Sequence, residues 1–276
     1  MAEIDVEDRR AAAQLDTQPR LSRLPGPSRL VRLPQAAWDA IAANRASETT
    51  LPPEVLQALH RAGFVEDSGM PSADWDLVLR GASRSAVRLD LVAVHGQTAW
   101  RTAVHVLGRD LVVVDQVHTV HSRGGQIELG VPSPAVTVGV ARLDHLSAVL
   151  ATLLPLVPAL QGAVDGAGSD GAADIPSVDP LAVAQAHLMV TSAPAGRPPL
   201  ALSTSWYAVG PDGTRLLTLR PGDAPADHPG AATSGGTGAA PAADPVVVHP
   251  AELYGLVRAQ LASALQHAET AQEEAR

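Results

Sequence analysis

Residues 88–114 read RLDLVAVHGQTAWRTAVHVLGRDLVVV, and this stretch decides the fold class. Apolar and polar residues alternate here with a period of two, which is the period of a β-strand. On the first strand the apolar face holds Val87, Leu89, Leu91 and Ala93. The triplets at 95–97 and 108–110 are turn-like, and connections this short join only antiparallel neighbours. The sequence therefore predicts an antiparallel meander.

Upstream of the meander, the sequence predicts one strand and three helices. The strand is expected at residues 29–33 and the first helix at 35–44. The prolines at 52–53 suit the first turn of a second helix. Asp74 is expected to cap the third helix.

Downstream, the extended pattern continues and then gives way to a helix. A turn at 123–125 is followed by extended pieces at 127–131 and 136–140. Asp144 is expected to cap the next helix. The buried face of that helix is formed by Leu146, Val149, Leu150, Leu153 and Leu154.

The second half of the chain repeats this plan. Strands are expected at 186–191, 200–206, 215–219 and 246–248, followed by a helix after Pro250. The two amphipathic helices align without gaps, Leu146, Val149 and Leu150 matching Leu253, Leu256 and Val257. The sequence thus predicts an α+β fold with a central antiparallel sheet and a pseudo-two-fold internal repeat.

A single domain at residues 29–268 accounts for these elements. Its halves are 29–160 and 176–268, joined by a Gly/Ala/Asp-rich linker at 161–175. Residues 1–28 and 269–276 are expected to be tails. A low-complexity loop is expected at 222–244, and all of these segments hold too little apolar surface to offset the entropy of ordering.

The composition excludes several classes of protein. The net charge of −9 argues against nucleic-acid binding, which needs a basic face. The absence of Cys excludes disulfides and Cys-ligated zinc. Aromatic residues make up 3%, few for a sugar site or a base-stacking platform. No apolar run approaches the ~18 residues of a membrane span, so no membrane insertion is expected. The acidic N-terminal sequence is unlike a signal peptide, so a cytoplasmic location is expected.

The motifs in the chain do not favour catalysis. Gly166-Ala-Gly-Ser-Asp-Gly171 matches G-x-G-x-x-G, but it lacks the strand before it and the helix after it that a dinucleotide loop needs. His118 and His121 would suit one metal ion on a helix, but the period indicates a strand, where residues three apart point to opposite faces and cannot chelate one ion. Ser203 and Ser205 lie in an expected strand, where a structural role is favoured. We therefore expect no cofactor, no metal and no enzymatic activity.

Several segments resemble the EspG family. They are LPPEVLQALHRAGFV (51–65), the meander at 88–114, DHLSAVLATLLP (144–155), WYAVGPDGTRLLTLRPG (206–222) and VVVHPAELYGLVRAQLASAL (246–265). The resemblance covers about residues 29–268, and the loop at 222–244 and the strand at 136–140 depart from the family pattern. It implies a central antiparallel sheet flanked by helical bundles, and a cytosolic chaperone of a type VII (ESX) secretion system that binds PE–PPE-like helical pairs.

Three classes of function are therefore compared. A secretion chaperone or adaptor ranks first, a generic protein-interaction or regulatory module second, and an enzyme with an unrecognised site third. A chaperone interface is expected to have a few aromatic or Arg residues that dominate binding. The expected contact residues are Gln97 and Trp100 at the first hairpin, with Trp206 and Tyr254 in the second half.

Overall fold

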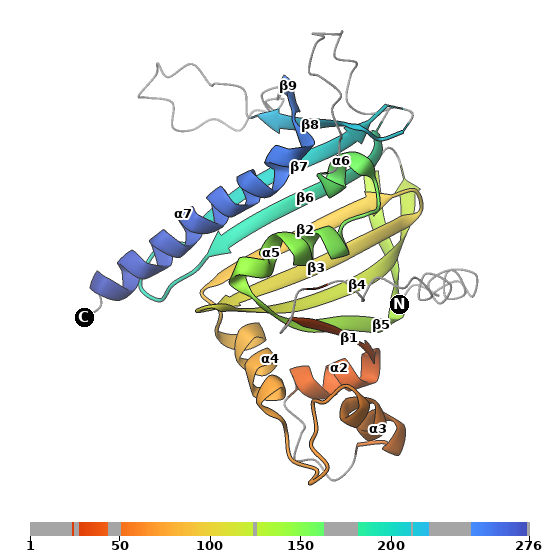
Figure 1. Cartoon of the computed structure of the whole chain (residues 1–276), viewed down its shortest axis with the longest axis vertical. Helices are drawn as coiled ribbons and strands as arrows, with labels where there is room; N and C mark the ends of the chain where they lie inside the picture. Colours follow the sequence, from red (N-terminus) through yellow and green to blue (C-terminus); the bar gives the residue numbers. More distant parts are fainter. Residues whose placement is uncertain are drawn as a thin grey trace, which may run out of the picture.

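The computed structural model describes residues 24, 28–43, 51–123, 126–162, 182–210, 212–220 and 244–274. These residues form a nine-stranded sheet in the order β1-β5-β4-β3-β2-β6-β7-β8-β9, in which every neighbouring pair is antiparallel. Helices accompany the sheet (Figure 1). The large central antiparallel sheet expected from the sequence is confirmed.

The N-terminal elements are one edge strand and three helices. They are β1 (Arg29–Pro34), α2 (Gln35–Ala42), α3 (Pro53–Arg61) and α4 (Ala73–Arg84). Ser72 caps α4, because its Oγ accepts a hydrogen bond from the backbone N–H of Trp75 at 3.4 Å. The expected cap, Asp74, instead lies in the first turn, where its charge favours the helix dipole.

The first meander consists of β2 (Val87–His95), β3 (Thr98–Leu107), β4 (Asp110–Arg123) and β5 (Gln126–Arg142). The two extended pieces expected at 127–131 and 136–140 belong to one strand, β5. Two register shifts, between Gln116 and His118 and between His118 and Val120, interrupt its pairing with β4. Such bulges bend a strand pair without ending it. In the sequence, Pro132 and Pro134 break the alternation, and β5 therefore reads there as two separate pieces.

A 3-10 turn and two helices follow the first meander. They are η2 (Leu143–His145), α5 (Leu146–Leu153) and α6 (Pro158–Gln161). Asp144 lies inside η2, and His145 occupies the N-cap of α5 without a capping hydrogen bond from its side chain, so the expected cap at Asp144 is wrong. The short helix α6 is not among the elements expected from the sequence.

The second meander consists of β6 (Ala182–Ser192), β7 (Leu200–Val209), β8 (Arg215–Arg220) and β9 (Asp244–Val248). It ends in η3 (Pro250–Glu252) and α7 (Leu253–Glu274). α7 continues past residue 268, where a tail was expected, and Ala271 is still buried. Most of the expected linker at 161–175 and loop at 222–244, and of the N-terminal tail, lies outside the described residues.

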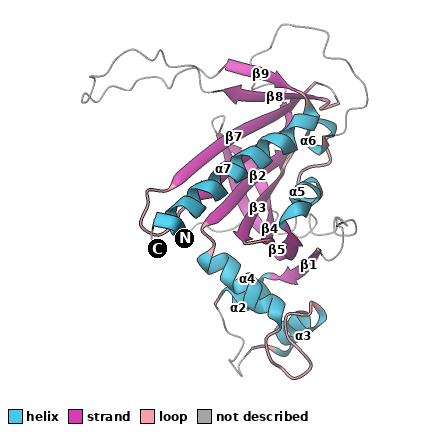
Figure 2. Ribbon diagram, turned by 60° about the vertical axis from the view of Figure 1, so that its left-hand side comes forward, coloured by secondary structure: helices cyan, strands magenta, loops and turns pink. Residues whose placement is uncertain are grey.

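The two faces of the sheet carry different layers. On the face toward the viewer in Figure 1, which we call the front face, α5, α6 and α7 pack on side chains such as Leu89, Leu188 and Trp206. On the opposite, back face, α2, α3 and α4 pack on the β1 side of the sheet, over Val112, Val136 and Val138. Figure 2 shows these two groups of helices from a second direction.

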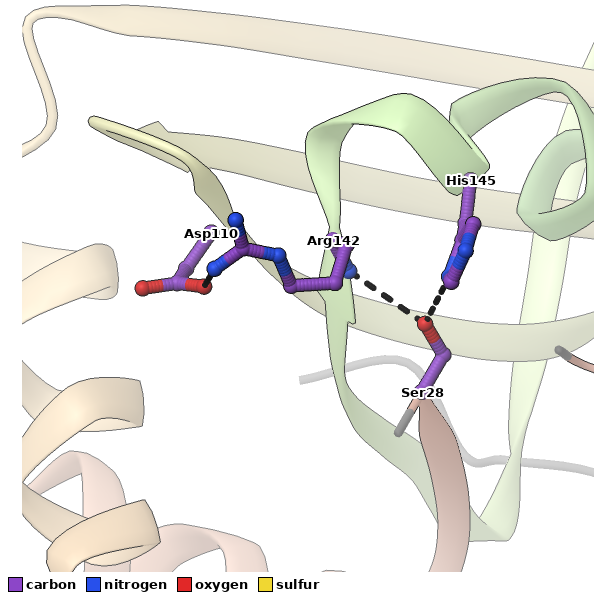
Figure 3. A network of polar contacts seen from close by, with 4 residues as sticks. All are labelled: Ser28, Asp110, Arg142 and His145. Carbon is purple, nitrogen blue, oxygen red and sulfur yellow. Dashed lines mark hydrogen bonds and ion pairs between the residues drawn. The ribbon is translucent and has the colours of Figure 1, made fainter. Parts of the chain in front are cut away.

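A polar network fixes the chain where it enters β1 (Figure 3). The Oγ of Ser28 accepts a hydrogen bond from the backbone N–H of Arg142 at 3.2 Å and contacts Nδ1 of His145 at 2.8 Å. Arg142 in turn donates to Asp110, its cross-strand partner, at 3.0 Å. The network thereby joins the start of β1, the end of β5 and the turn before α5.

Two helical glycines give a test of the packing between α4 and β4. A Cβ on Gly81 would lie 2.7 Å from Cγ2 of Val112, whereas a Cβ on Gly255 of α7 would meet nothing within 4 Å. Overpacking costs about 1–3 kcal/mol and outweighs the helix-propensity gain of about 1 kcal/mol. We expect Gly81→Ala to lower the free energy of unfolding and Gly255→Ala to raise it, as measured by urea denaturation. Equal effects of the two substitutions would contradict this packing.

Candidate functional site

The helices that the structure describes do not cover the back face over the middle of the sheet. Directly paired residues share a face, so the register places the side chains of four adjacent strands in rows. We call this surface the back-face platform. It consists of Arg101 and Ala103 of β3, Asp90, Val92 and Val94 of β2, Gln185, His187 and Met189 of β6, and Ser203, Ser205 and Tyr207 of β7.

The platform mixes apolar and polar side chains. Arg101, His187, Met189 and Ser203 are exposed, and Val92 and Tyr207 are half-buried. Met189 keeps 37% of its surface exposed. This surface differs from the front face, where the corresponding positions of β2 and β6 are buried Leu, Val and Ala.

A cavity of about 320 Å³ opens on the platform. Its lining is mixed, because the register sets Gln185 between Val94 and Tyr207, and His187 between Val92 and Ser205; Ala186 and Leu129 complete it. Leu129 comes from the far end of the β4–β5 pair, beyond the bulges, where β4 continues past its last partner in β3. The bulged β4–β5 pair therefore places Leu129 beside β2, β6 and β7, although neither β4 nor β5 pairs with those strands.

One histidine and one serine of the cavity are in contact. Nδ1 of His187 lies 2.9 Å from Oγ of Ser205, and the two residues are direct cross-strand partners. A Ser–His pair is the minimal nucleophile arrangement, but acyl transfer also needs free N–H donors for the oxyanion. Strand pairing engages the backbone N–H groups at this position, so only side chains, such as the amide of Gln185, could supply such donors here.

The electrostatics of the back face are dominated by arginine and histidine. Arg88 forms an ion pair with Asp90. Burial lowers the pKa of His105, with a smaller lowering effect from Arg88. Burial also lowers the pKa of His118, by more than the hydrogen bond to the carbonyl of Gly130 raises it, and Arg101 adds a smaller lowering effect. These two imidazoles are therefore neutral at pH 7, and Arg101 supplies an exposed positive charge.

The structure separates the four contact residues expected from the sequence. Gln97 is exposed at the β2–β3 turn, where its carbonyl accepts a hydrogen bond from the N–H of Val120 at 3.0 Å. Trp100 and Trp206 are 5% and 2% exposed in the front core, so neither side chain offers surface to a partner. Tyr254 is half-buried and donates to the carbonyl of Leu160 at 3.2 Å, and burial raises its pKa to about 12.

The platform residues were missed because no motif marks them. Ser205 was interpreted as structural, yet it lines the cavity with His187 and Tyr207. The alternation in β2 and β7 indicates a polar face opposite the core, and it is the feature of the sequence that could have pointed to the platform. Which side chains meet on that face depends on the register between β2 and β6, which the sequence does not state.

The histidine pair of β4 lies at the bulges. Nδ1 of His118 lies 3.4 Å from the carbonyl oxygen of Gly130, and a Cβ on Gly130 would lie 2.6 Å from Nε2 of His121. Strict alternation along β4 would place His118 and His121 on opposite faces of the sheet, and the bulges interrupt that alternation. Within the described residues there is no group of three or more His, Cys, Asp or Glu side chains that could hold a metal ion. The G-x-G-x-x-G segment lies outside the described residues.

No known protein family matches this chain. No curated protein matches it with significant similarity either. Among the helices that the structure describes, none combines the length and the apolar character needed to cross a bilayer.

The two buried histidines predict how stability depends on pH. Because the folded state lowers both pKa values, it binds fewer protons than the unfolded state, whose histidines titrate near about 6.5. The contribution of these two histidines to the free energy of unfolding is therefore fully present above about pH 6.5. It decreases as the pH drops below that value. We expect the double variant His105→Gln/His118→Gln to lose less stability than wild type between pH 7.5 and 5.0 in urea titrations. The exposed His60→Gln is the control, and an unchanged pH dependence in the double variant would contradict the assignment.

Substitution distinguishes the core role of Trp206 from the surface role of Gln97. Trp206→Ala removes a large buried side chain, so we expect the free energy of unfolding to fall by about 3–5 kcal/mol. Gln97→Ala at the exposed turn is expected to change it by less than about 0.5 kcal/mol. Chemical denaturation measures both values, and a small effect of Trp206→Ala would place that side chain outside the core.

Proposed function

We propose that this protein is a cytosolic chaperone or adaptor of a type VII (ESX) secretion system that binds helical secretion substrates, such as PE–PPE-like pairs. The observation that carries the proposal is the back-face platform, a partly apolar sheet surface that the described helices leave open. Contiguous exposed apolar surface with a polar rim is typical of protein-binding sites. The resemblance to the EspG family supplies the class of partner.

The composition of the platform suits a partner that must later be released. The interface core of a permanent complex is strongly apolar, whereas transient interfaces are about as polar as the rest of the surface. Met189, Val92 and Tyr207 supply apolar area, and Ser203, Gln185 and His187 supply hydrogen-bonding groups. A secretion chaperone needs this balance, because it must hold its substrate in the cytosol and then give it up.

The order of elements supports a pseudo-two-fold repeat of the kind that the EspG resemblance implies. Each half contains a four-stranded meander, a 3-10 turn and a helix, in the orders β2-β3-β4-β5-η2-α5 and β6-β7-β8-β9-η3-α7. Leu143 and Leu146 begin the turn and the helix in one half, and Pro250 and Leu253 begin them at the same spacing in the other. The first strands of the two meanders pair antiparallel, with Leu91 opposite Leu188. We propose a two-fold axis at this pair, with the helices as flanking bundles.

Charge and composition support the cytosolic location in this proposal. A net charge of −9 keeps a protein with an exposed apolar surface in solution and suppresses self-association. The alternative is a generic protein-interaction or regulatory module on the same architecture, which would use the platform for a partner outside secretion.

Co-expression with the small helical proteins encoded beside the gene tests the proposal. We expect a stoichiometric complex that co-elutes in size-exclusion chromatography, with substrates that are insoluble when expressed alone. The variant Ser205→Trp, which fills the cavity, should weaken the complex, and Arg109→Trp at the exposed β3–β4 turn should not. If no neighbouring helical protein co-elutes, the secretion role is wrong and the generic module becomes the better interpretation.

A further inference from the structure

We propose that Ser205 is a nucleophile that hydrolyses small uncharged esters, with His187 as its general base. The substrate has a short acyl chain, which lies in the cavity of the back-face platform, and a good leaving group. This activity goes beyond the proposed function and does not depend on it, because it needs a small molecule at the cavity and no protein partner.

The surroundings of Ser205 set it apart from other serines that contact a histidine. Within the described part of the chain, the distance between serine Oγ and histidine Nδ1 is 2.8 Å for Ser28 and His145, 3.1 Å for Ser192 and His267, and 2.9 Å for Ser205 and His187. Ser192 is 0% exposed, so no substrate reaches it. Oγ of Ser28 also accepts a hydrogen bond from the backbone N–H of Arg142. Of the three pairs, the Ser205 pair is the one that lines the cavity.

His187 is positioned to remove the hydroxyl proton of Ser205. The two residues are direct cross-strand partners, and Nδ1 accepts a hydrogen bond from the hydroxyl when the ring proton is on Nε2. Among the described residues, no carboxylate forms an ion pair or a hydrogen bond with His187. The imidazolium that forms during the reaction therefore lacks the stabilisation that a third member of a triad provides. For this reason the pair suits an ester with a good leaving group and not an amide.

Two neighbouring side chains supply the donors that the paired backbone does not. Gln185 and Tyr207 form the next cross-strand pair on the same face, about 7 Å along the strands from the Ser205 pair. Both line the same cavity. Among the described residues, no hydrogen bond engages the amide of Gln185 or the hydroxyl of Tyr207. Their N–H and O–H groups therefore remain to stabilise the oxyanion of a tetrahedral intermediate.

The reaction has two steps. Oγ of Ser205 attacks the carbonyl carbon of the ester and its proton moves to Nδ1 of His187; the bond to the leaving group then breaks, and the alcohol departs with that proton. Water next attacks the acyl-serine, again with His187 as base, which releases the carboxylic acid and restores the serine hydroxyl. A cavity of about 320 Å³ is at the small end for ligand sites, and Val92, Val94 and Leu129 supply apolar surface for a short acyl chain.

A fluorophosphonate probe and the ester p-nitrophenyl butyrate test this proposal on the full chain. We expect the probe to label Ser205, as located by mass spectrometry of peptides, and not Ser28 or Ser192. Ser205→Ala should abolish both the labelling and the hydrolysis of the ester. The control is Ser263→Ala, at an exposed position of α7, which should leave both unchanged.

Variants of the base and of the oxyanion donors provide the second arm of the experiment. His187→Gln is expected to lower kcat/KM at least about 100-fold, whereas His267→Gln, which removes the imidazole of the buried pair, should leave it unchanged. Gln185→Leu and Tyr207→Phe should each lower kcat at least about tenfold with little change in KM, because an oxyanion donor acts in the transition state. Circular dichroism checks that every variant is folded.

The outcomes separate this activity from the proposed function. Equal hydrolysis by the wild type and Ser205→Ala, or labelling of another serine, would overturn the nucleophile. An undiminished rate in folded His187→Gln would overturn the assignment of the base. Each of these results leaves the chaperone role standing, because co-elution with helical substrates does not require an acyl-serine. Labelling of Ser205 without co-elution would support the nucleophile and overturn the secretion role.

Discussion

The antiparallel pairing of β2 with β6 is the interaction on which the rest of the structure depends. It joins two meanders that are far apart in the chain, and it runs from Val87 opposite Ser192 to His95 opposite Ala184. The side chains that it aligns on the front face, including Leu89, Leu91 and Leu188, are 0–4% exposed beneath the helices. Without this ladder each half would have an unpaired central strand and an incomplete core.

The same ladder creates the candidate site. Because neighbouring residues of a strand point to opposite faces, the pairing that buries leucines in front also sets Val92 beside His187 and Asp90 beside Met189 behind. The front face is filled by α5 and α7, while α2, α3 and α4 cover only the β1 side of the back face. Among the described residues, the middle of the back face is therefore the part of the sheet that no helix covers.

Local signals in the sequence were sufficient for most of the strands. Alternation of apolar residues and short Gly-containing turns marked β2, β3, β7 and β8, and the helix periodicity marked α5 and α7. The errors have physical causes. Prolines and two bulges hid the continuity of β5, and the 3-10 turn displaced Asp144 from the cap of α5.

The candidate site could not be predicted in the same way. Its residues come from four strands and from Leu129, and their meeting depends on a register between residues about a hundred positions apart. Aromatic residue type suggested Trp100 and Trp206 instead, but large aromatic side chains stabilise cores as readily as interfaces, and here the front core takes both. Fold class follows from local pattern, whereas a binding surface built across strands requires the tertiary pairing.

The two outermost strands of the sheet have a consequence for the behaviour of the protein at high concentration. β1 and β9 are short, at 6 and 5 residues, and each contains a proline, Pro34 or Pro245, that cannot donate a backbone hydrogen bond to a further strand. A wide antiparallel sheet with long, regular borders would add copies of itself side by side and grow into a fibre. Here the borders are too short and too interrupted to serve as a template. The borders of the described sheet therefore offer few backbone groups on which a further strand could pair.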